Sequence, residues 1–405
     1  MKYNRSILTG RKPGFGKHAL ALRSLSIGSI FILLAALAAC KQTAKPAGTT
    51  TSDKPVAPKT NIQYSKGFTI QYFEHYKLLN IVNRFSDKTD TLHYILVQRG
   101  TPVPTHHPGA MVVQIPVQKM VVTSSMHVGM ADFAEAANVI AAVADDKYIN
   151  SPLVRKNLAA GKVVAVGNGS NMNNELIISL KPDLVMTMGS PDAPFNRYQP
   201  LIGAGIPVMM NAEWLETDPL GRSEWVKLMA ALLNKEELVN QKFDTLVKEY
   251  NRMKALATAV KEKPQVVIGL PFKGQWFVPD GDSYLTQFLK DAGASYHWAD
   301  VISKGSLALN FETVAPIALK ADFWLNMGNF QTKAEIAAAD ERYTRFNPYK
   351  KGTLYNCNKR MNDIGANDYW ESGAVNPHLI LADLIAIFHP DLLPGHQLYY
   401  YKQLQ

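Results

Sequence analysis

The sequence predicts an α/β protein of two lobes, with mainly parallel sheets flanked by helices and one long α-helix that bridges the lobes. First, short apolar runs of strand length alternate with helical segments, which is the pattern of βαβ units. Second, residues 235–263 keep helical spacing without a Gly or Pro. Third, the phrase KPDLVMTMG at 181–189 recurs as KADFWLNMG at 320–328, which indicates that one architecture occurs twice.

Residues 1–39 have the pattern of a secretory signal peptide. Six Lys and Arg residues with no acid come first, and a short apolar run then ends in LAAC. The cysteine after the small residues, Cys40, resembles the lipobox cysteine of bacterial lipoproteins, whose thiol is acylated. We therefore expect a periplasmic lipoprotein that Cys40 holds on the membrane surface without spanning it. The alternative is an ordinary apolar leader that happens to contain a cysteine.

The charge of the chain says little about its partners once the leader is removed. The net charge is +9 at pH 7, and the six positive charges of the leader leave about +3, so no nucleic-acid partner is predicted. Cys357 is the second cysteine and cannot build a disulfide framework alone. No second apolar stretch has the length of a membrane helix. The mature protein is expected to be a monomer that is soluble apart from its anchor.

Residues 40–61 comprise the lipidated cysteine and a segment rich in Thr, Lys, Pro and Ala. Such a segment buries too little apolar surface to offset the entropy of ordering it, so it is predicted to be a flexible tether. Roughly 340 residues remain, more than a single core usually holds. The predicted parts are an N-terminal lobe at 62–233, a bridging helix at 234–262 and a C-terminal lobe at 263–405.

The N-terminal lobe is predicted to open with an extra antiparallel β-ribbon at 62–105. Its segments 68–84 and 92–100 alternate apolar and polar residues, as strands with one buried face do. Further strands are predicted at 119–124, 162–167, 183–189 and 206–211, and helices at 132–143, 173–180 and 197–205. This alternation favours a parallel sheet covered by helices.

The pattern becomes helical after residue 221. One amphipathic helix is predicted at 223–234, followed by the long helix, and a helix of about 25 residues extends nearly 40 Å. That length is enough to pass from one lobe to the other. Beyond it the alternation restarts, with strands predicted at 265–271, 322–328 and 352–357 and helices at 283–293, 311–320 and 378–390.

The repeated phrase describes a short helix that ends, a Lys-x-Asp turn, a buried strand and a Gly where the strand opens into a loop. Lys near the carbonyl end of a helix and Asp in the turn have a plain structural role. The repeat by itself therefore indicates similar turns and does not indicate a function.

Two segments resemble one known family. VGNGSNMNNELIISLKPDLVMT at 166–187 and NDYWESGAVNPHLILADLIAIFHPDLLP at 367–394 resemble the periplasmic-binding-protein domains that deliver vitamin B12, ferric siderophores and haem to ABC importers. The resemblance covers roughly residues 115–395, and Asn174 directly precedes Glu175 where the family has an intervening Leu. It implies a class III solute-binding lipoprotein with no resident cofactor, whose ligand is a ferric siderophore, haem or a corrinoid and whose partner is a permease dimer.

The resemblance gives a role to one acid in each lobe. Glu175 and Glu312 match the family positions that form ion pairs with arginines on the two halves of the permease. Glu in a first helical turn is also favoured by the helix dipole, by tenths of a kcal/mol, which leaves a purely structural role open. The matched positions in two lobes favour docking, where two charges at fixed separation would set the register of the complex.

The ligand is expected between the lobes, beside the loops that follow the carboxyl ends of the strands. Aromatic residues on these loops suit a large, partly flat ligand, although about half of them are expected to pack beneath their own loops. The candidate ligand contacts are Met126, His127, Phe195, Arg197, Trp214, Trp276, Phe277, Phe330, Tyr369 and Trp370. Arginines could pair with carboxylates of the ligand, and the further candidates are Arg222, Arg342 and Arg345.

Direct capture of a bare metal ion is not predicted. His106 and His107 are adjacent, His127 is isolated, and no spaced set of three or four ligands appears. His127 as an axial ligand of haem remains open. Enzyme signatures such as Gly-x-Ser-x-Gly, a P-loop or His-Glu-x-x-His are missing from the sequence. An enzyme that acts on a bound chelate and a surface adhesion lipoprotein remain the alternatives from other classes.

Overall fold

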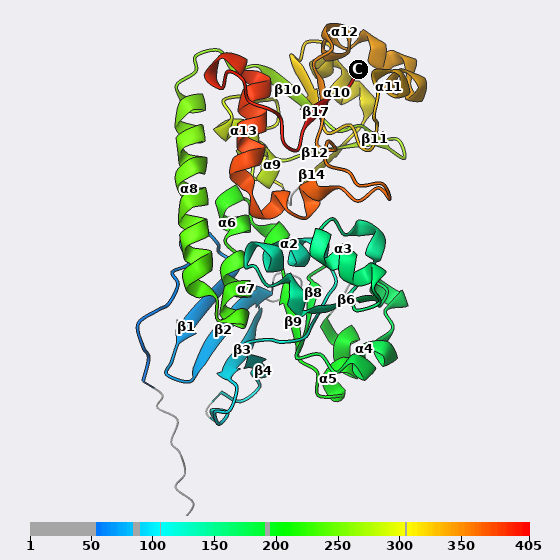
Figure 1. The fold of residues 1–405 in the computed structure, drawn as a ribbon. Coiled ribbons are helices and arrows are strands. Elements are labelled where there is room, and N and C mark those ends of the chain that lie inside the picture. The colour runs from blue at the N-terminus through cyan, green and yellow to red at the C-terminus, as the bar shows by residue number, and fades with distance from the viewer. Residues whose placement is uncertain (1–53, 84–89, 106, 191–194, 304–305) are drawn as a thin grey trace, which may run out of the picture. The chain divides into compact units, whose positions relative to one another are not determined.

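The computed structural model describes residues 54–405 except 84–89, 106, 191–194 and 304–305 (Figure 1). The predicted signal peptide 1–39, Cys40 and His106 lie outside the described residues. Two five-stranded sheets that are mainly parallel are flanked by helices, which confirms the predicted fold class. The lobe boundaries themselves stay predictions. In the described part of the chain, no helix combines the length and apolarity that a bilayer crossing requires.

A four-stranded sheet with the order β1-β2-β3-β4 comes first. Its strands are β1 (Phe68–Tyr72), β2 (Tyr76–Asn83), β3 (Asp90–Gln98) and β4 (Met111–Ile115). The first three are antiparallel, as predicted for the ribbon, but β4 pairs in parallel with β3. Alternate residues such as Leu79 and Ile81 are fully buried and join the main core. The sheet therefore extends beyond the predicted ribbon at 62–105 and packs on the rest of the lobe.

The segment before this sheet is bonded to the body of the protein. The sequence predicts a flexible tether through residue 61, whereas Val56 N donates to Tyr72 O at 2.9 Å and Lys227 Nζ donates to Asn61 O at 2.6 Å. Thr60 is 7% exposed and its Oγ1 donates to Asn240 Oδ1 at 2.6 Å. The prediction is wrong for these residues because composition does not reveal hydrogen-bond partners that lie far away in the sequence.

Two buried carboxylates hold the next few residues. Glu224 accepts hydrogen bonds from the backbone N–H groups of residues 63–65 at 2.7–3.1 Å. Glu216 accepts from Lys66 N at 3.0 Å and Gly67 N at 2.9 Å. We call residues 60–67 the N-terminal strap. Since backbone amides away from water need a partner, the two carboxylates fix the strap against the helices α6 (Pro219–Ser223) and α7 (Val226–Leu233).

The sheet of the N-terminal lobe has the order β7-β6-β5-β8-β9, and all of its pairs are parallel. Its strands are β5 (Met120–Val122), β6 (Ile140–Val143), β7 (Val164–Ala165), β8 (Leu184–Met188) and β9 (Val208–Asn211). The helices of this lobe are α2 (Ser125–Phe133), α3 (Pro152–Ala159), α4 (Asn174–Leu180), α5 (Gln199–Gly203), α6 (Pro219–Ser223) and α7 (Val226–Leu233). Interleaved strands and helices are the βαβ arrangement that the sequence predicts.

One predicted helix, at 132–143, is wrong. The helix α2 begins at Ser125, because the Ser124 side chain caps it by accepting from Met126 N at 3.3 Å. Glu135 adopts a left-handed conformation with φ 53°, and residues 140–143 then form the buried strand β6. The Ala and Val residues of this segment are compatible with either structure, and packing in the parallel sheet decides for the strand.

The long helix α8 (Glu236–Thr258) packs against elements of both lobes. Its buried residues Val239, Phe243, Leu246, Tyr250 and Met253 recur at spacings of three and four and form one apolar face. Along this face α8 contacts α7 of the N-terminal lobe and then α9 (Tyr284–Asp291) and α13 (Pro377–Phe388) of the C-terminal lobe. Figure 1 shows α8 passing beside both lobes. The predicted bridging helix is thus present with bounds close to those expected.

The C-terminal lobe holds a five-stranded sheet with the order β13-β10-β15-β16-β17 and a three-stranded sheet with the order β11-β12-β14. Their strands are β10 (Gln265–Ile268), β11 (Pro271–Phe272), β12 (Gln275–Pro279), β13 (Ser295–Tyr296), β14 (Ser306–Leu309), β15 (Phe323–Leu325), β16 (Leu354–Asn356) and β17 (Lys402–Gln403). The helices are α9 (Tyr284–Asp291), α10 (Phe311–Ala318), α11 (Lys333–Ala339), α12 (Asn347–Lys351) and α13 (Pro377–Phe388). Only β17 pairs antiparallel in the larger sheet.

The repeated Asp has the same role in both copies of the phrase, although the turns differ, because Lys181 is left-handed and Lys320 is not. Asp183, before β8, accepts from Gln118 N at 2.7 Å and Lys119 N at 3.0 Å, and Asp322, before β15, accepts from Gln265 N at 2.9 Å. In each case the carboxylate bonds backbone amides at the start of the neighbouring strand. The repeated Asp therefore fixes the entry of a central strand, which agrees with the structural role predicted for it.

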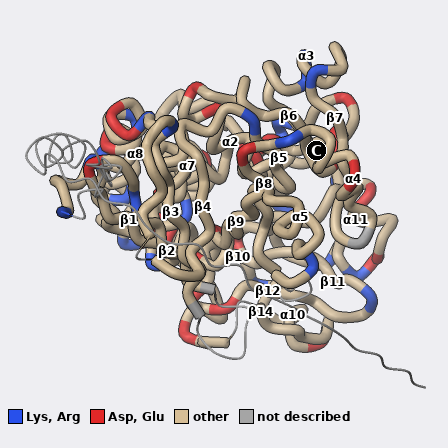
Figure 2. Tube along the Cα trace, turned by 90° about the horizontal axis from the view of Figure 1, so that it is seen from below, with Lys and Arg blue, Asp and Glu red and all other residues tan. Residues whose placement is uncertain are grey.

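Charged residues of both signs are distributed around the described chain. Figure 2 shows Lys and Arg interspersed with Asp and Glu along the Cα trace. Several acids point inward instead of to solvent, among them Glu216, Glu224 and Glu371, each at most 5% exposed. The acids of this chain thus serve in part as internal hydrogen-bond acceptors.

Candidate functional site

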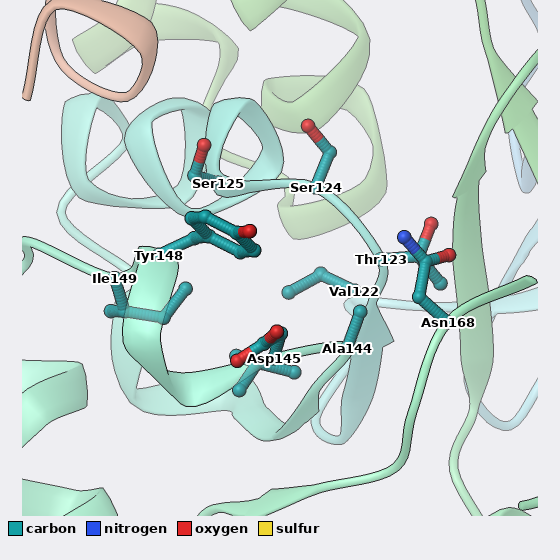
Figure 3. A pocket seen from close by; sticks show the side chains of 10 residues that line it. Val122, Thr123, Ser124, Ser125, Ala144, Asp145, Tyr148, Ile149 and Asn168 are labelled. Carbon is teal, nitrogen blue, oxygen red and sulfur yellow. The ribbon is translucent and has the colours of Figure 1, made fainter. Parts of the chain in front are cut away.

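A cavity lies at the carboxyl ends of β5 and β6, the edge where open parallel sheets bind ligands. Its volume is about 150 Å³, and Figure 3 shows the side chains that line it. They are Val122, Thr123, Ser124, Ser125, Val143, Ala144, Asp145, Tyr148, Ile149 and Asn168. We call it the strand-end cavity. It forms there because the chain leaves each parallel strand at this edge before it turns into the next helix or loop.

The strand-end cavity has hydroxyl and amide groups on one side. Thr123 Oγ1 accepts from Met188 N at 3.2 Å, and Asn168 Oδ1 accepts from Gly169 N at 2.8 Å. Their oxygens are thus held by backbone amides. Among the described residues, none accepts a hydrogen bond from the Ser124 hydroxyl, the Ser125 hydroxyl or the Asn168 amide group. These donors are available to a ligand.

The other side of the cavity combines a carboxylate with an aromatic ring. Asp145 Oδ1 accepts from Lys147 N at 3.1 Å and so caps a short 3-10 turn, and Oδ2 lies 3.1 Å from Lys147 Nζ. The neighbouring Tyr148 is 55% exposed, and its ring lies between Ser125 and Asp145 in Figure 3. The side chains of Val122, Val143 and Ile149 also line the cavity, are almost fully buried and form its apolar part.

The loop that carries Tyr148 and Ile149 is held by a segment of the C-terminal lobe. Glu371 accepts from Asn150 N at 2.8 Å and from Ser151 N at 2.6 Å. Asn362 Nδ2 also donates to Ile149 O at 3.0 Å. The lobes are therefore joined by hydrogen bonds directly beside the strand-end cavity, in addition to the connection through α8.

The carboxyl group of Glu371 is only 2% exposed, and its protonation is perturbed. Burial raises the pKa of Glu371 to about 8, and the hydrogen bonds from Asn150 and Ser151 oppose this shift only in part. The negative charges of Asp368 and Asp132 raise it further. The contact between the lobes is thus sensitive to pH near neutrality.

Some of the predicted ligand contacts are exposed. Trp214 is 39% exposed, with Nε1 donating to Gly189 O at 2.9 Å, and Trp370 is 54% exposed. Phe277, which was predicted on a loop, lies within the strand β12 and is 46% exposed. Large contiguous apolar patches mark binding sites, whereas single exposed rings are common on protein surfaces. These three side chains can contact a ligand without rearrangement.

Other predicted ligand contacts lie in the core. Met126, His127, Trp276 and Tyr369 are each at most 4% exposed. Trp276 packs among aromatic rings and donates from Nε1 to Ile268 O at 2.8 Å, so its polar group is already satisfied. The remaining candidates are half-buried, and they are Phe195, Arg197 and Phe330.

His127 is fully buried in α2, and neither of its ring nitrogens has a hydrogen-bond partner among the described residues. Burial lowers the pKa of His127 to about 3, so the ring is neutral at physiological pH. A haem iron could reach it only after α2 moved. Within the described residues, no group of three or more His, Cys, Asp or Glu side chains could hold a metal ion.

The arginines singled out from the sequence have protein partners nearby. Arg222 lies 3.6 Å from Glu213 and over the ring of Tyr284, and Arg342 pairs with Asp340 at 2.6 Å. The guanidinium of Arg197 lies over the Tyr198 ring at 5.9 Å, and Arg345 is exposed. None of the four is positioned at the strand-end cavity.

Glu175 and Glu312 occupy matched positions. Each is exposed in the first turn of its helix, α4 or α10. Each helix is capped by an asparagine two residues earlier, Asn173 or Asn310, which accepts from the backbone N–H three residues on at 2.9 Å and 2.8 Å. Neither glutamate forms an ion pair with another described residue, so both carboxylates are free to meet a partner.

The residues of the strand-end cavity were missed from the sequence. The loop after β5 was singled out for Met126 and His127, but the helix that begins there buries both and leaves the serines at the cavity. The signal was the run Thr123-Ser124-Ser125 directly after a buried strand, since helix-capping residues at a strand end mark the edge of the sheet. Asp145 and Tyr148 could not be found because the strand before them was predicted as a helix.

A larger and more open groove of about 750 Å³ lies along α8, lined by residues that include Leu246, Lys248 and His378. It lies away from the strand ends, and Lys242, which lines it, is bonded to Phe133 O at 2.6 Å. The strand-end cavity is therefore the better candidate for the site.

Comparison with known proteins agrees with the observed fold. A family model described as periplasmic binding protein matches residues 130–361, more than half of the chain. An uncharacterized lipoprotein of Methanocaldococcus jannaschii is 26% identical over 380 residues, which cover 87% of this chain and 88% of that relative.

Solved structures show the same fold at low sequence identity. A periplasmic binding protein from Veillonella parvula has a TM-score of 0.55 at 16% identity and covers 75% of this chain and 96% of that one. A possible iron-binding, periplasmic solute-binding protein from Staphylococcus epidermidis has a TM-score of 0.53 at 15% identity, covering 68% and 99%. The periplasmic haem-binding protein HutB of Vibrio cholerae has a TM-score of 0.51 at 14% identity, covering 65% and 98%. At these identities the likeness concerns the fold alone.

Proposed function

The chain belongs to the periplasmic binding protein family, and from this premise we propose that it is the solute-binding lipoprotein of an ABC importer. Members of this family bind solutes and are not enzymes. The family and the lipoprotein relative support a location outside the cytoplasm. Anchoring through Cys40 and a permease dimer as partner are parts of the proposal.

The observation that carries the proposal is the matched pair of exposed carboxylates, Glu175 and Glu312. Each follows an asparagine cap at the start of a short helix, and each helix leads through a Lys-x-Asp turn into a central strand of its own sheet. Individual surface ion pairs contribute little free energy. Two charges at fixed separation instead select one orientation of the complex, so that the ligand faces the transport path.

The proposed ligand is an iron chelate of the ferric siderophore class, with haem or cobalamin as the alternative. The exposed rings of Trp214, Phe277 and Trp370 support a ligand with apolar or flat parts. The buried state of His127 gives no support to haem ligation by this residue. An absorption spectrum of the purified protein, followed by a thermal screen with these ligands, tests the choice, because a bound ligand raises the melting temperature.

Charge reversal tests the docking role. The double variant Glu175→Arg/Glu312→Arg should abolish uptake in cells, because two repulsive contacts replace two attractive ones, while ligand affinity of the purified protein stays unchanged. Glu237→Arg, an exposed glutamate in the first turn of α8, is the matched control and should leave both uptake and affinity intact. A parallel loss of affinity in the double variant would place these acids in the ligand site or the fold and contradict docking.

A further inference from the structure

We propose that the strand-end cavity binds one neutral, hydroxyl-bearing six-membered ring, either as a free solute or as an arm of a larger ligand. The inference rests on the proposed function only in that the protein captures a solute. It goes beyond that function because it names the chemistry that this cavity recognises.

The size of the cavity sets the size of the group. An engineered cavity of about 150 Å³ in another protein binds benzene, whereas pockets for drug-sized ligands have roughly 300 Å³ or more. The strand-end cavity has about 150 Å³. It therefore has room to enclose one six-membered ring, and a whole tetrapyrrole or chelate would extend outside it.

The lining suits a ring that has apolar faces and polar edges. Val122, Val143 and Ile149 are at most 2% exposed and form the apolar part of the lining. Tyr148 presents a ring that is 55% exposed although its neighbour Ile149 is buried. An aromatic ring beside a cavity gains free energy when it covers an apolar face of a ligand.

The hydrogen-bonding groups match hydroxyls, which both donate and accept. The Ser124 and Ser125 hydroxyls and the Asn168 amide group can donate to ligand oxygens. Across the cavity, Asp145 is engaged by Lys147 N and Nζ, and the further lone pairs of its carboxylate can accept from a ligand hydroxyl. A group that only accepts or only donates would leave one side of the cavity without a partner.

The carboxylate of Asp145 disfavours an anionic group in the cavity. Asp145 lies in the lining, so its charge is close to any group that binds there. Lys147 is already paired with Asp145 at 3.1 Å. A carboxylate or phosphate would therefore face like charge at short range, which disfavours it relative to a neutral ring.

Isothermal titration of the mature protein with glucose and with myo-inositol tests the inference, with acetate and inorganic phosphate as anionic probes. We expect a neutral ring to bind, and Asp145→Asn and Ser125→Ala each to weaken it about tenfold, since each removes a hydrogen bond to the ligand. Tyr148→Leu should weaken it several-fold without loss of stability, because the ring is exposed. Asp146→Asn is the matched control: Asp146 is exposed next to Asp145, does not line the cavity, and should leave affinity unchanged.

Phenyl β-glucoside distinguishes the two sources of the ring. If phenyl β-glucoside binds about tenfold more tightly than glucose, and if Trp214→Ala or Trp370→Ala removes this gain, the ring is an arm of a larger ligand. If the two compounds bind with equal affinity, the ring is a free solute. Both results support the inference. Three results would overturn it. The protein could bind the anions in preference to the rings, it could bind no ring, or Asp145→Asn could bind the ring with the same affinity as wild type. A protein that binds an iron chelate but no ring would overturn this inference alone, and the uptake experiment on Glu175 and Glu312 tests the proposed function separately.

Discussion

Glu371 places a buried carboxyl group between two parts of the chain that are more than two hundred residues apart. It accepts hydrogen bonds from Asn150 and Ser151 at the start of α3, while burial disfavours its ionised form. Together with Asn362, this residue of the C-terminal lobe thus holds the loop that lines the strand-end cavity. Its effect on the protein depends on its protonation.

Replacement of Glu371 should flatten the dependence of stability on pH. The pKa of Glu371 in the folded protein, about 8, lies above the ordinary value of 4.5. Its contribution to the stability of the folded protein is therefore fully present below about pH 4.5 and is lost as the pH rises through about 8. Between about pH 4.5 and about pH 8, the melting temperature of wild type, measured by circular dichroism, should therefore fall more than that of Glu371→Gln. The exposed Glu262→Gln serves as the control and should follow wild type. If the melting temperatures of wild type and Glu371→Gln depend on pH in the same way, the raised pKa of Glu371 is contradicted.

The aromatic residues show how little a side chain by itself says about its role. Trp276 and Trp370 both follow turn-like sequences and both suit a ligand, yet the first is fully buried and the second is 54% exposed. The difference arises from the aromatic cluster around Trp276, which includes Trp324 and Phe346. The partners that bury Trp276 come from other elements, so no local pattern predicts it.

At the scale of elements, the N-terminal strap depends on acids that follow it by about 150 residues. Glu224 is fully buried, accepts from three successive strap amides and pairs with Lys227 at 2.8 Å. The four-stranded sheet is thereby attached to α6 and α7. Loss of either carboxylate leaves buried donors without an acceptor.

Glu224→Ala should reduce the free energy of unfolding by about 3–5 kcal/mol, because it leaves Lys227 and the strap amides buried without their partner. Urea unfolding of the mature protein, with limited proteolysis of the strap, measures the effect. Glu237→Ala removes an exposed glutamate of α8 and should change stability by no more than about 0.5 kcal/mol. If the two variants unfold at the same urea concentration, the strap does not depend on Glu224.

For the whole molecule, the stiff helix α8 predicts that the lobes move little relative to each other when ligand binds. The contact between α2 and the Glu371 segment adds to this restraint. A Cβ atom on Gly129 of α2 would lie 2.3 Å from the backbone O of Glu371, so the two backbones approach more closely than any other residue type allows.

Gly129→Ala should therefore push the lobes apart, because neither backbone can yield without moving its lobe. Spin labels at Ser179 and Lys320, both exposed and one in each lobe, measure the separation in a Cys357→Ser background. We expect a longer and broader distance distribution in the variant. Gly203→Ala is the control, since a Cβ there meets no atom within 4 Å, and its distribution should match wild type. An unchanged distribution for Gly129→Ala would show that the contact does not restrain the lobes.

The sequence by itself determined the class of fold, the long helix and the matched turns. These features depend on local periodicity and turn chemistry: the apolar face of α8 recurs every three or four residues, and each Lys-x-Asp turn lies between a short helix and a buried strand. The exposed glutamates Glu175 and Glu312 could be placed for the same reason, because a first helical turn is a local feature.

Only the tertiary structure decided which residues line the candidate site. His127 and Trp276 became core residues, and Ser125, Asp145 and Tyr148 came together at the ends of β5 and β6. The bonds from Glu371 to the cavity loop and from Glu224 to the strap also join distant segments. Burial and such contacts depend on what other elements place beside a residue, and a local pattern contains no information about those neighbours.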